Sequence, residues 1–202
     1  MTQLFWAKDK VWLMLLVNVL SSIVSRYIEK CFGKECLNTI LSDYGVKLFS
    51  KNRHRERVCL IPKSVSTIVS IDLININVVA VGIIIGWIEK NSVFIPSTHL
   101  FNMVREKGFN IGCSIVAKQH GVKAFLYGRD LLALSVERFL YPVEKDMYVA
   151  VLDSEDMSVI GIGKLVIDPS DLGKLLSEGK VLALVVKNVF DLGILLRDEE
   201  YV

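Results

Sequence analysis

The sequence predicts an α+β fold in which an N-terminal antiparallel sheet with flanking helices is followed by a small C-terminal β-barrel. Helical and extended patterns alternate in the first part of the chain. Many short strands separated by turn residues follow in the second part, as is typical of small barrels. The pattern changes at the polar segment 119–121, so we expect one domain over residues 1–119 and another over residues 120–202.

The first elements of the chain are a helix and a hairpin. Residues 8–30 predict an amphipathic helix, because apolar side chains recur there every four residues. These side chains are Val11, Leu15, Val19, Ile23 and Tyr27. Residues 46–50 and 57–61 are typical of two strands, and the residues between them, 51–56, predict a charged hairpin loop.

The rest of the N-terminal domain continues the alternation of strands and helices. A long apolar run predicts a strand that turns at residues 89–91 and returns as a second strand ending at Pro96. A helix is expected between an N-cap at Ser97 and a stop at Gly108. Residues 109–118 then predict one more strand before the polar boundary segment.

The C-terminal domain is predicted to consist mainly of short strands. They cover residues 123–128, 147–153, 158–167, 181–186 and 192–197. One short helix is expected after Gly128. Another is expected after Asp168, with Pro169 at its first position and Gly179 as its stop.

The composition and the lengths of the apolar segments bear on two questions, whether the chain is soluble and whether its charge favours binding to nucleic acid. Hydrophobic residues make up 52% of the 202 residues, which supports a sizeable core, and the net charge of +2 means that any basic patch must be local. The apolar segment 11–24 is shorter than the roughly 20 residues that span a membrane. A signal peptide is the alternative there, although its cleavage pattern is weak. Segment 71–88 favours buried strands, so we expect a soluble chain without a membrane partner.

The chain shows no pattern that predicts a metal, a cofactor or catalysis. Its four cysteines form no CxxC pair and its histidines no HxxxH pair, so we expect no metal site, and the scattered thiols indicate a reducing compartment. Neither GxxxxGK[ST] nor GxGxxG after a strand is present, so a phosphate-binding loop is not expected. The acidic turn at residues 153–156 predicts a hairpin loop rather than a catalytic carboxylate pair.

Four segments of the C-terminal part are "FLYGRDLL", "VAVLD", "VIGIGKLVI" and "DLGILLRDEE". In order and spacing they resemble a PUA domain, the RNA-binding module named for pseudouridine synthases and archaeosine transglycosylases. With "ERVCLIPKSVSTIVS" and "VVAVGIIIGWIEKNSVFIPSTHL", the chain is also similar to the Nip-seven ribosome-biogenesis family from about residue 30 onward. The resemblance implies RNA binding without catalysis in assembly of the large ribosomal subunit. The implied partners are an rRNA precursor and other assembly factors, in the cytoplasm or, in a eukaryote, the nucleolus.

The candidate RNA-binding residues centre on Gly128 and Arg129. Gly128 is predicted to end the first barrel strand in a tight turn, so that Arg129 and the N-terminus of the next helix attract a phosphate. A plain turn with a solvated arginine is the alternative. The full set, which includes basic residues of the later strands, is Lys123, Gly128, Arg129, Lys164, Lys180, Lys187 and Arg197. An auxiliary RNA contact is proposed at the hairpin loop residues Lys51, Arg53, Arg55 and Arg57.

Two other classes of function stay open at this point. PUA domains often accompany catalytic domains, so an RNA-modifying enzyme or its accessory subunit is one alternative. A protein-interaction scaffold is the other, since the N-terminal half is very apolar and could serve as a docking surface. We favour a monomeric RNA-binding protein that is not an enzyme, because no acid–base pair or catalytic motif is evident.

Overall fold

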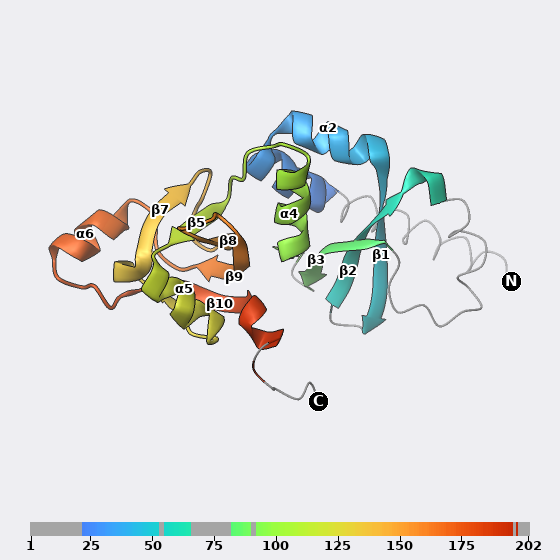
Figure 1. Ribbon diagram of the computed structural model, residues 1–202. Coiled ribbons are helices and arrows are strands. Elements are labelled where there is room, and N and C mark those ends of the chain that lie inside the picture. The colour runs from blue at the N-terminus through green and yellow to red at the C-terminus, as the bar shows by residue number, and fades with distance from the viewer. Residues whose placement is uncertain (1–21, 53–54, 66–81, 90–91, 196, 198–202) are drawn as a thin grey trace, which may run out of the picture. The chain divides into compact units, whose positions relative to one another are not determined.

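The computed structural model describes residues 22–52, 55–65, 82–89, 92–195 and 197. The fold class is α+β, as predicted, and the chain divides into two compact units, Met1–Ile95 and Pro96–Val202 (Figure 1). This division lies before the boundary at residues 119/120 that the sequence predicts. The polar segment there forms the first turn of a helix inside the second unit, where Gly121 and Val122 are buried.

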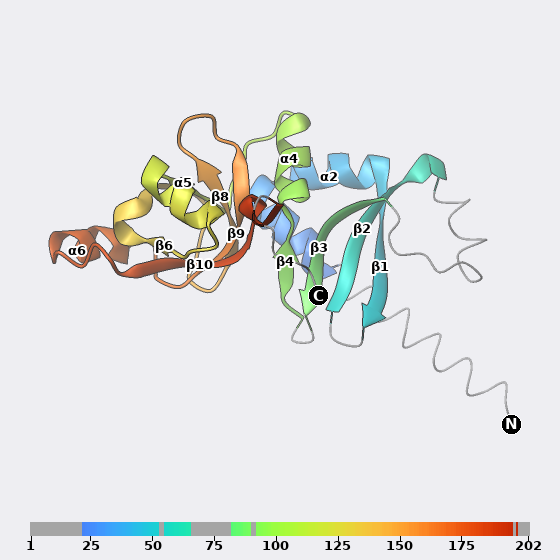
Figure 2. The ribbon, with the colours of Figure 1, turned by 60° about the horizontal axis from the view of Figure 1, so that its bottom comes forward.

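The N-terminal unit contains an antiparallel sheet and helices. Residues 22–32 are helical and are followed by α2, Lys34–Asp43. The strands are β1 (Tyr44–Asn52), β2 (Arg55–Pro62), β3 (Ile83–Glu89) and β4 (Phe94–Pro96), in the order β1-β2-β3-β4 (Figure 2). The predicted hairpin is confirmed, because β1 and β2 pair antiparallel with Tyr44 opposite Pro62.

The first predicted helix is confirmed where the structure describes it. Its residues 8–21 lie outside the described part of the chain, and the remainder is helical. Val24 and Ile28, one turn apart, are buried in the core of this unit. Tyr27 packs edge-on against Phe94 of β4 at a centroid distance of 5.2 Å, and its burial raises the pKa of the phenol.

The C-terminal unit is built around one mixed sheet. It begins with α4 (Thr98–Glu106), whose N-cap Ser97 and positive-φ Gly108 agree with the predicted limits. The sheet elements are β5 (Ser114–Ala117), β6 (Leu131–Leu132), β7 (Val136–Leu140), β8 (Tyr148–Asp153), β9 (Val159–Leu165) and β10 (Leu184–Asp191). Their order is β6-β10-β9-β8-β5-β7, with β5 and β8 parallel and the other pairs antiparallel.

Helices and 3-10 turns complete the C-terminal unit. They are α5 (Gln119–Leu126), η1 (Ala133–Ser135), α6 (Asp171–Ser177) and η2 (Leu192–Leu195). Val122 and Phe125 of α5 join the apolar core of this unit, together with residues of β5, β8, β9 and β10. In both ribbon views α6 projects away from the rest of the unit, and none of its residues is buried (Figures 1 and 2).

Three secondary-structure predictions for this unit are wrong. The segment "KAFLYG" forms the end of α5 and the turn after it instead of a strand, because Val122 and Phe125 follow the helical period and reach the core. The residues after Gly128 form β6, η1 and β7 instead of a helix, with Leu131 and Val136 buried. The segment "LGILLR" contributes η2, and no side chain fits at Gly193 because a Cβ would overlap the Leu126 carbonyl.

Among the described residues, no helix is both long and apolar enough to cross a membrane.

All four cysteines, Cys31, Cys36, Cys59 and Cys113, are buried and contribute to the cores of their own units. Cys36 and Cys59 are present as thiols, which agrees with the interpretation of these two residues as small apolar side chains. Cys31 and Cys113 are disulfide-bonded, so the prediction that all four cysteines are thiols is wrong, and the reducing compartment inferred from it loses its support.

Candidate nucleic-acid interface

The turn at Gly128 ends α5, so the predicted helix N-terminus at this place is wrong. Gly128 has a φ of +77°, and its N–H donates to the Phe125 carbonyl at 2.9 Å. The N–H of Arg129 donates to the Ala124 carbonyl at 3.1 Å. These two bonds are the Schellman arrangement that closes a helix C-terminus, where the helix dipole favours cations. The positive charge of Arg129 therefore suits this helix end, but the backbone there does not form an anion site.

Strand β10 holds the turn in place through Asn188. The Asn188 side-chain amide donates to the Phe125 carbonyl at 3.0 Å and to the Asp191 carboxylate at 3.2 Å. The Asn188 backbone N–H donates to Oδ1 of Asp130 at 2.7 Å. Because these bonds join the end of α5 and the residue after Arg129 to one strand, the loop 128–130 is fixed relative to the sheet.

Arg197 fills a structural position beside the same turn. Its guanidinium meets the Asp191 carboxylate through two bonds of 3.0 and 3.1 Å and also donates to the Leu126 carbonyl. The side chains of Arg197 and Asp191 are 20% and 4% exposed. A Cβ on Gly128 would lie 3.3 Å from Arg197 Nη2, so the glycine leaves room for this arginine. Most of the hydrogen-bonding capacity of Arg197 is therefore used inside the protein.

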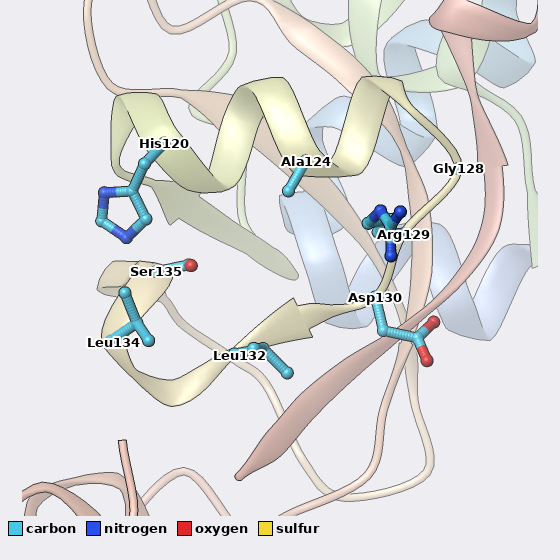
Figure 3. Close-up of a pocket in the computed structure, with 8 residues that line it drawn as sticks. All are labelled: His120, Ala124, Gly128, Arg129, Asp130, Leu132, Leu134 and Ser135. Atoms are coloured by element: carbon cyan, nitrogen blue, oxygen red, sulfur yellow. The ribbon is translucent and has the colours of Figure 1, made fainter. Parts of the chain in front are cut away.

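A groove with a volume of about 530 Å³ opens between α5 and the β6–η1 segment (Figure 3). Its lining residues are His120, Ala124, Gly128, Arg129, Asp130, Leu132, Leu134 and Ser135. Figure 3 shows His120 and Ala124 on α5 facing the residues of β6 and η1 across the groove, with Arg129 at the Gly128 end. The groove therefore has apolar side chains along its walls, His120 at one end, and Arg129 and Asp130 at the other.

A row of polar side chains crosses the sheet of this unit. Lys187 of β10 lies opposite Lys164 of β9, which lies opposite Tyr148 of β8, and directly paired residues face the same side of a sheet. Lys187 is exposed, and its neighbour Asn188 is bonded to Asp130 next to Arg129. The Lys164 ammonium forms a 2.8 Å ion pair with Asp146, which raises the pKa of Lys164 and lowers that of Asp146. We call Arg129, Lys187 and Lys164 the basic track.

The two remaining predicted cations flank the groove. Lys123 is exposed on α5, one turn before Tyr127. Lys180 forms a 2.8 Å ion pair with Glu178, which raises the pKa of the lysine. Lys180 precedes Val181, whose carbonyl accepts the Leu134 N–H at the η1 side of the groove. The structure thus leaves Lys123, Arg129 and Lys187 exposed, and of these three Arg129 lines the groove.

The auxiliary basic cluster is only partly described. Arg53 lies outside the described residues, as does the side chain of Lys51. Arg55 forms a 3.1 Å ion pair with Glu89 of the neighbouring strand, and both side chains are exposed. Arg57 lies on β2 opposite Phe49 of β1 and Trp87 of β3. Part of the expected loop is therefore strand, and the RNA contact at this cluster stays a prediction.

Comparison with known proteins identifies the unit that carries the groove. The model of the UPF0113 PUA domain matches residues 113–200. This part of the chain is a PUA domain. No curated protein matches the chain.

Solved structures match the chain at low sequence identity. A hypothetical protein of the hyperthermophilic archaeon Pyrococcus horikoshii OT3 matches at 15% identity and a TM-score of 0.60, over 90% of this chain and 92% of that one. A PUA domain from Aeropyrum pernix K1 matches at 17% identity and 0.47, over 79% and 81%. A conserved PUA domain protein from Thermoplasma acidophilum matches at 12% and 0.49, over 77% and 85%.

The sequence analysis did not predict several of the residues that line the groove of the PUA domain. They are His120, Ala124, Asp130, Leu132, Leu134 and Ser135. His120, Ala124 and Gly128 are spaced by four residues, so they share one side of α5, but this signal appears only once the segment is treated as a helix. The walls contributed by β6 and η1 depend on contacts distant in sequence, which no local pattern indicates.

Proposed function

We propose that this protein is a non-catalytic RNA-binding protein that acts in assembly of the large ribosomal subunit. The observation that carries the proposal is a groove in the PUA domain lined by the exposed Arg129, together with the exposed Lys187 on β10, whose backbone neighbour Asn188 holds the groove turn. Phosphate contacts of this kind position a nucleic acid without reading its sequence. The RNA backbone follows the basic track, and the groove beside it accepts parts of a nucleotide.

The ribosomal part of the proposal rests on the resemblance of the chain to the Nip-seven family. Support comes from the segments "FLYGRDLL" and "DLGILLRDEE", both inside the part that matches a PUA domain model. The similarity in fold to the Pyrococcus protein extends over nine tenths of the chain, so the N-terminal unit has a structural counterpart as well. On this proposal the N-terminal unit binds other assembly factors and the PUA domain binds the rRNA precursor.

Charge reversal on the basic track tests RNA binding. Arg129→Glu and Lys187→Glu are each compared with Lys174→Glu, which makes the same charge change at an exposed position on α6. We expect both track variants to lose affinity for a structured rRNA fragment in a filter-binding titration, while the α6 variant retains most of it. Equal loss in all three variants would contradict a localised interface.

The assembly role needs a separate experiment in the source cells. A tagged chain is crosslinked to RNA with ultraviolet light, and the bound RNA is sequenced. We expect reads from precursors of the large-subunit rRNA and cosedimentation of the protein with large-subunit precursors. Reads mainly from other RNA classes would leave RNA binding intact and reject the role in ribosome assembly.

A further inference from the structure

Tyr127 is a large aromatic residue whose side chain is mostly exposed in the described structure. It is 74% exposed, which is the highest value among the exposed large hydrophobic residues in the described ranges. Within those ranges its ring pairs with no other ring, and its hydroxyl has no hydrogen-bond partner. The ring therefore has no evident part in the packing of the PUA domain, although single exposed apolar residues are common.

Tyr127 has basic residues close to it in the sequence, on α5 and in the turn that follows. Lys123 precedes Tyr127 by four residues, so the two side chains lie on the same side of α5. Gly128 and Arg129 follow directly, and both line the groove. Along the chain the ring thus lies between an exposed lysine and an exposed arginine, at the end of the helix that forms one wall of the groove.

The backbone that carries the ring is fixed on several sides. The Tyr127 N–H donates to the carbonyls of Lys123 and Ala124 at 3.2 and 3.1 Å. The carbonyl of the preceding residue, Leu126, accepts a bond from Arg197, and the turn that follows is closed by the Schellman bonds described above. A ring held on such a backbone loses little conformational freedom when a ligand covers it.

We infer that Tyr127 is a stacking platform for an unpaired nucleobase and that the interface therefore takes single-stranded RNA. Aromatic side chains stack on bases that have left a helix, whereas both faces of each base in an uninterrupted duplex are covered by neighbouring bases. The phosphates on either side of the stacked base meet Lys123 and Arg129. This inference rests on the proposed RNA-binding function and specifies its substrate class.

Substitution of the ring tests the inference on the full chain. Tyr127→Ala is expected to weaken binding of a single-stranded 12-nucleotide RNA by about 5- to 150-fold, the effect of losing one base–aromatic stack. Tyr127→Phe keeps the ring and should bind as the unchanged protein does. Tyr141→Ala is the matched control, since Tyr141 is 66% exposed directly after β7, and its substitution should not affect binding.

A crosslink distinguishes stacking from an indirect effect on the fold. 5-Iodouridine is placed at each position of the oligonucleotide in turn. Each complex is irradiated, and the crosslinked peptide is identified by mass spectrometry. We expect one position to crosslink to the peptide that contains Tyr127, and the thermal midpoint of Tyr127→Ala to equal that of the unchanged protein. Attachment only to other peptides would reject Tyr127 as the platform.

Each further outcome bears on a different statement. Equal or tighter binding of a blunt duplex of the same length would overturn the single-strand inference and leave RNA binding standing. Unchanged single-strand affinity in Tyr127→Ala would overturn the role of the ring alone. Failure of the unchanged protein to bind any single-stranded, duplex or structured RNA would overturn the proposed function and this inference together.

Discussion

Arg197 ties the end of α5 to the end of β10, whereas Arg129 beside it extends into the groove. The Arg197 side chain is largely buried and bonds to the Asp191 carboxylate and the Leu126 carbonyl. Arg129 is exposed and lines the groove. Sequence alone treated both arginines as RNA contacts, because their charge is visible in the sequence and their partners are not.

Arg197→Ala should destabilise the PUA domain. The substitution leaves the Asp191 carboxylate buried without its partner, which typically costs about 3–5 kcal/mol, and the lower end applies here because Arg197 is partly exposed. Differential scanning calorimetry should show a clear fall in the thermal midpoint. Arg197→Lys keeps the charge but loses the bidentate geometry, so its thermal midpoint should lie between those of the unchanged protein and the alanine variant. An unchanged midpoint for the alanine variant would contradict the structural role.

Arg129→Ala should weaken RNA binding without affecting stability. The side chain is exposed, so its removal leaves no buried group unpaired. Loss of one phosphate contact should reduce affinity for different RNA sequences by similar factors and make the salt dependence less steep by about 0.7–1 in log–log slope. Titrations at several salt concentrations measure this change. A loss confined to one RNA sequence would instead indicate that Arg129 reads a base.

Asp146→Asn should tighten RNA binding. The ion pair with Asp146 occupies Lys164 and adds a negative charge beside the basic track, so removal of that charge favours a phosphate. We expect a gain of a few-fold at low salt, and none for the control Asp171→Asn on the exposed helix α6. Weaker binding in Asp146→Asn would show that the carboxylate supports the interface.

The same pair has a defined pH dependence. The Lys164 ammonium lowers the pKa of the Asp146 carboxyl, so the ion pair is complete above the usual carboxyl pKa. It is lost only as the pH falls through the lowered value. The gain in Asp146→Asn should therefore persist across neutral pH and vanish in acid, where the aspartate of the unchanged protein is protonated.

At the scale of elements, the turn after α5 determines how β6 enters the sheet. Gly128→Ala places a side chain at a φ of +77° and brings its Cβ 3.3 Å from Arg197. The left-handed conformation costs a non-glycine residue about 1–2 kcal/mol. The thermal midpoint of Gly128→Ala should therefore fall by several degrees. The midpoint of Gly128→Asn should fall less, because asparagine tolerates this conformation. Equal stability of all three proteins would contradict the strained turn.

The strongly patterned elements were predictable, and the elements around the groove were not. The β1–β2 hairpin, α4, β8 and β9 show alternating or helical periods over enough residues to identify their type. Helix α5 has only two turns, so its apolar residues also fit a strand. The end of β10 turns into η2 because Gly193 lies against the Leu126 carbonyl. That contact joins residues far apart in sequence, so no local pattern predicts it.

At the scale of the whole molecule, the net charge is only +2, so RNA binding must depend on a few local cations. Three of the predicted contacts, Lys164, Lys180 and Arg197, form ion pairs within the protein. Lys123, Arg129 and Lys187 are exposed, and among the described residues no ion pair involves them. RNA that reaches a fourth cation must therefore compete with a carboxylate, and Lys164 is the natural candidate because it lies opposite Lys187.

The salt dependence of binding separates an interface on the PUA domain from one shared with the N-terminal unit. Four phosphate contacts on a single strand give a log–log slope of roughly −3, since each contact contributes about −0.7. If Lys51, Arg53, Arg55 and Arg57 also met phosphates, the slope would approach roughly −6 on the same basis. We expect the shallower value for a 12-nucleotide RNA, because Arg55 already pairs with Glu89. A slope near the steeper value, reduced by Arg55→Ala together with Arg57→Ala, would instead place the hairpin in the interface.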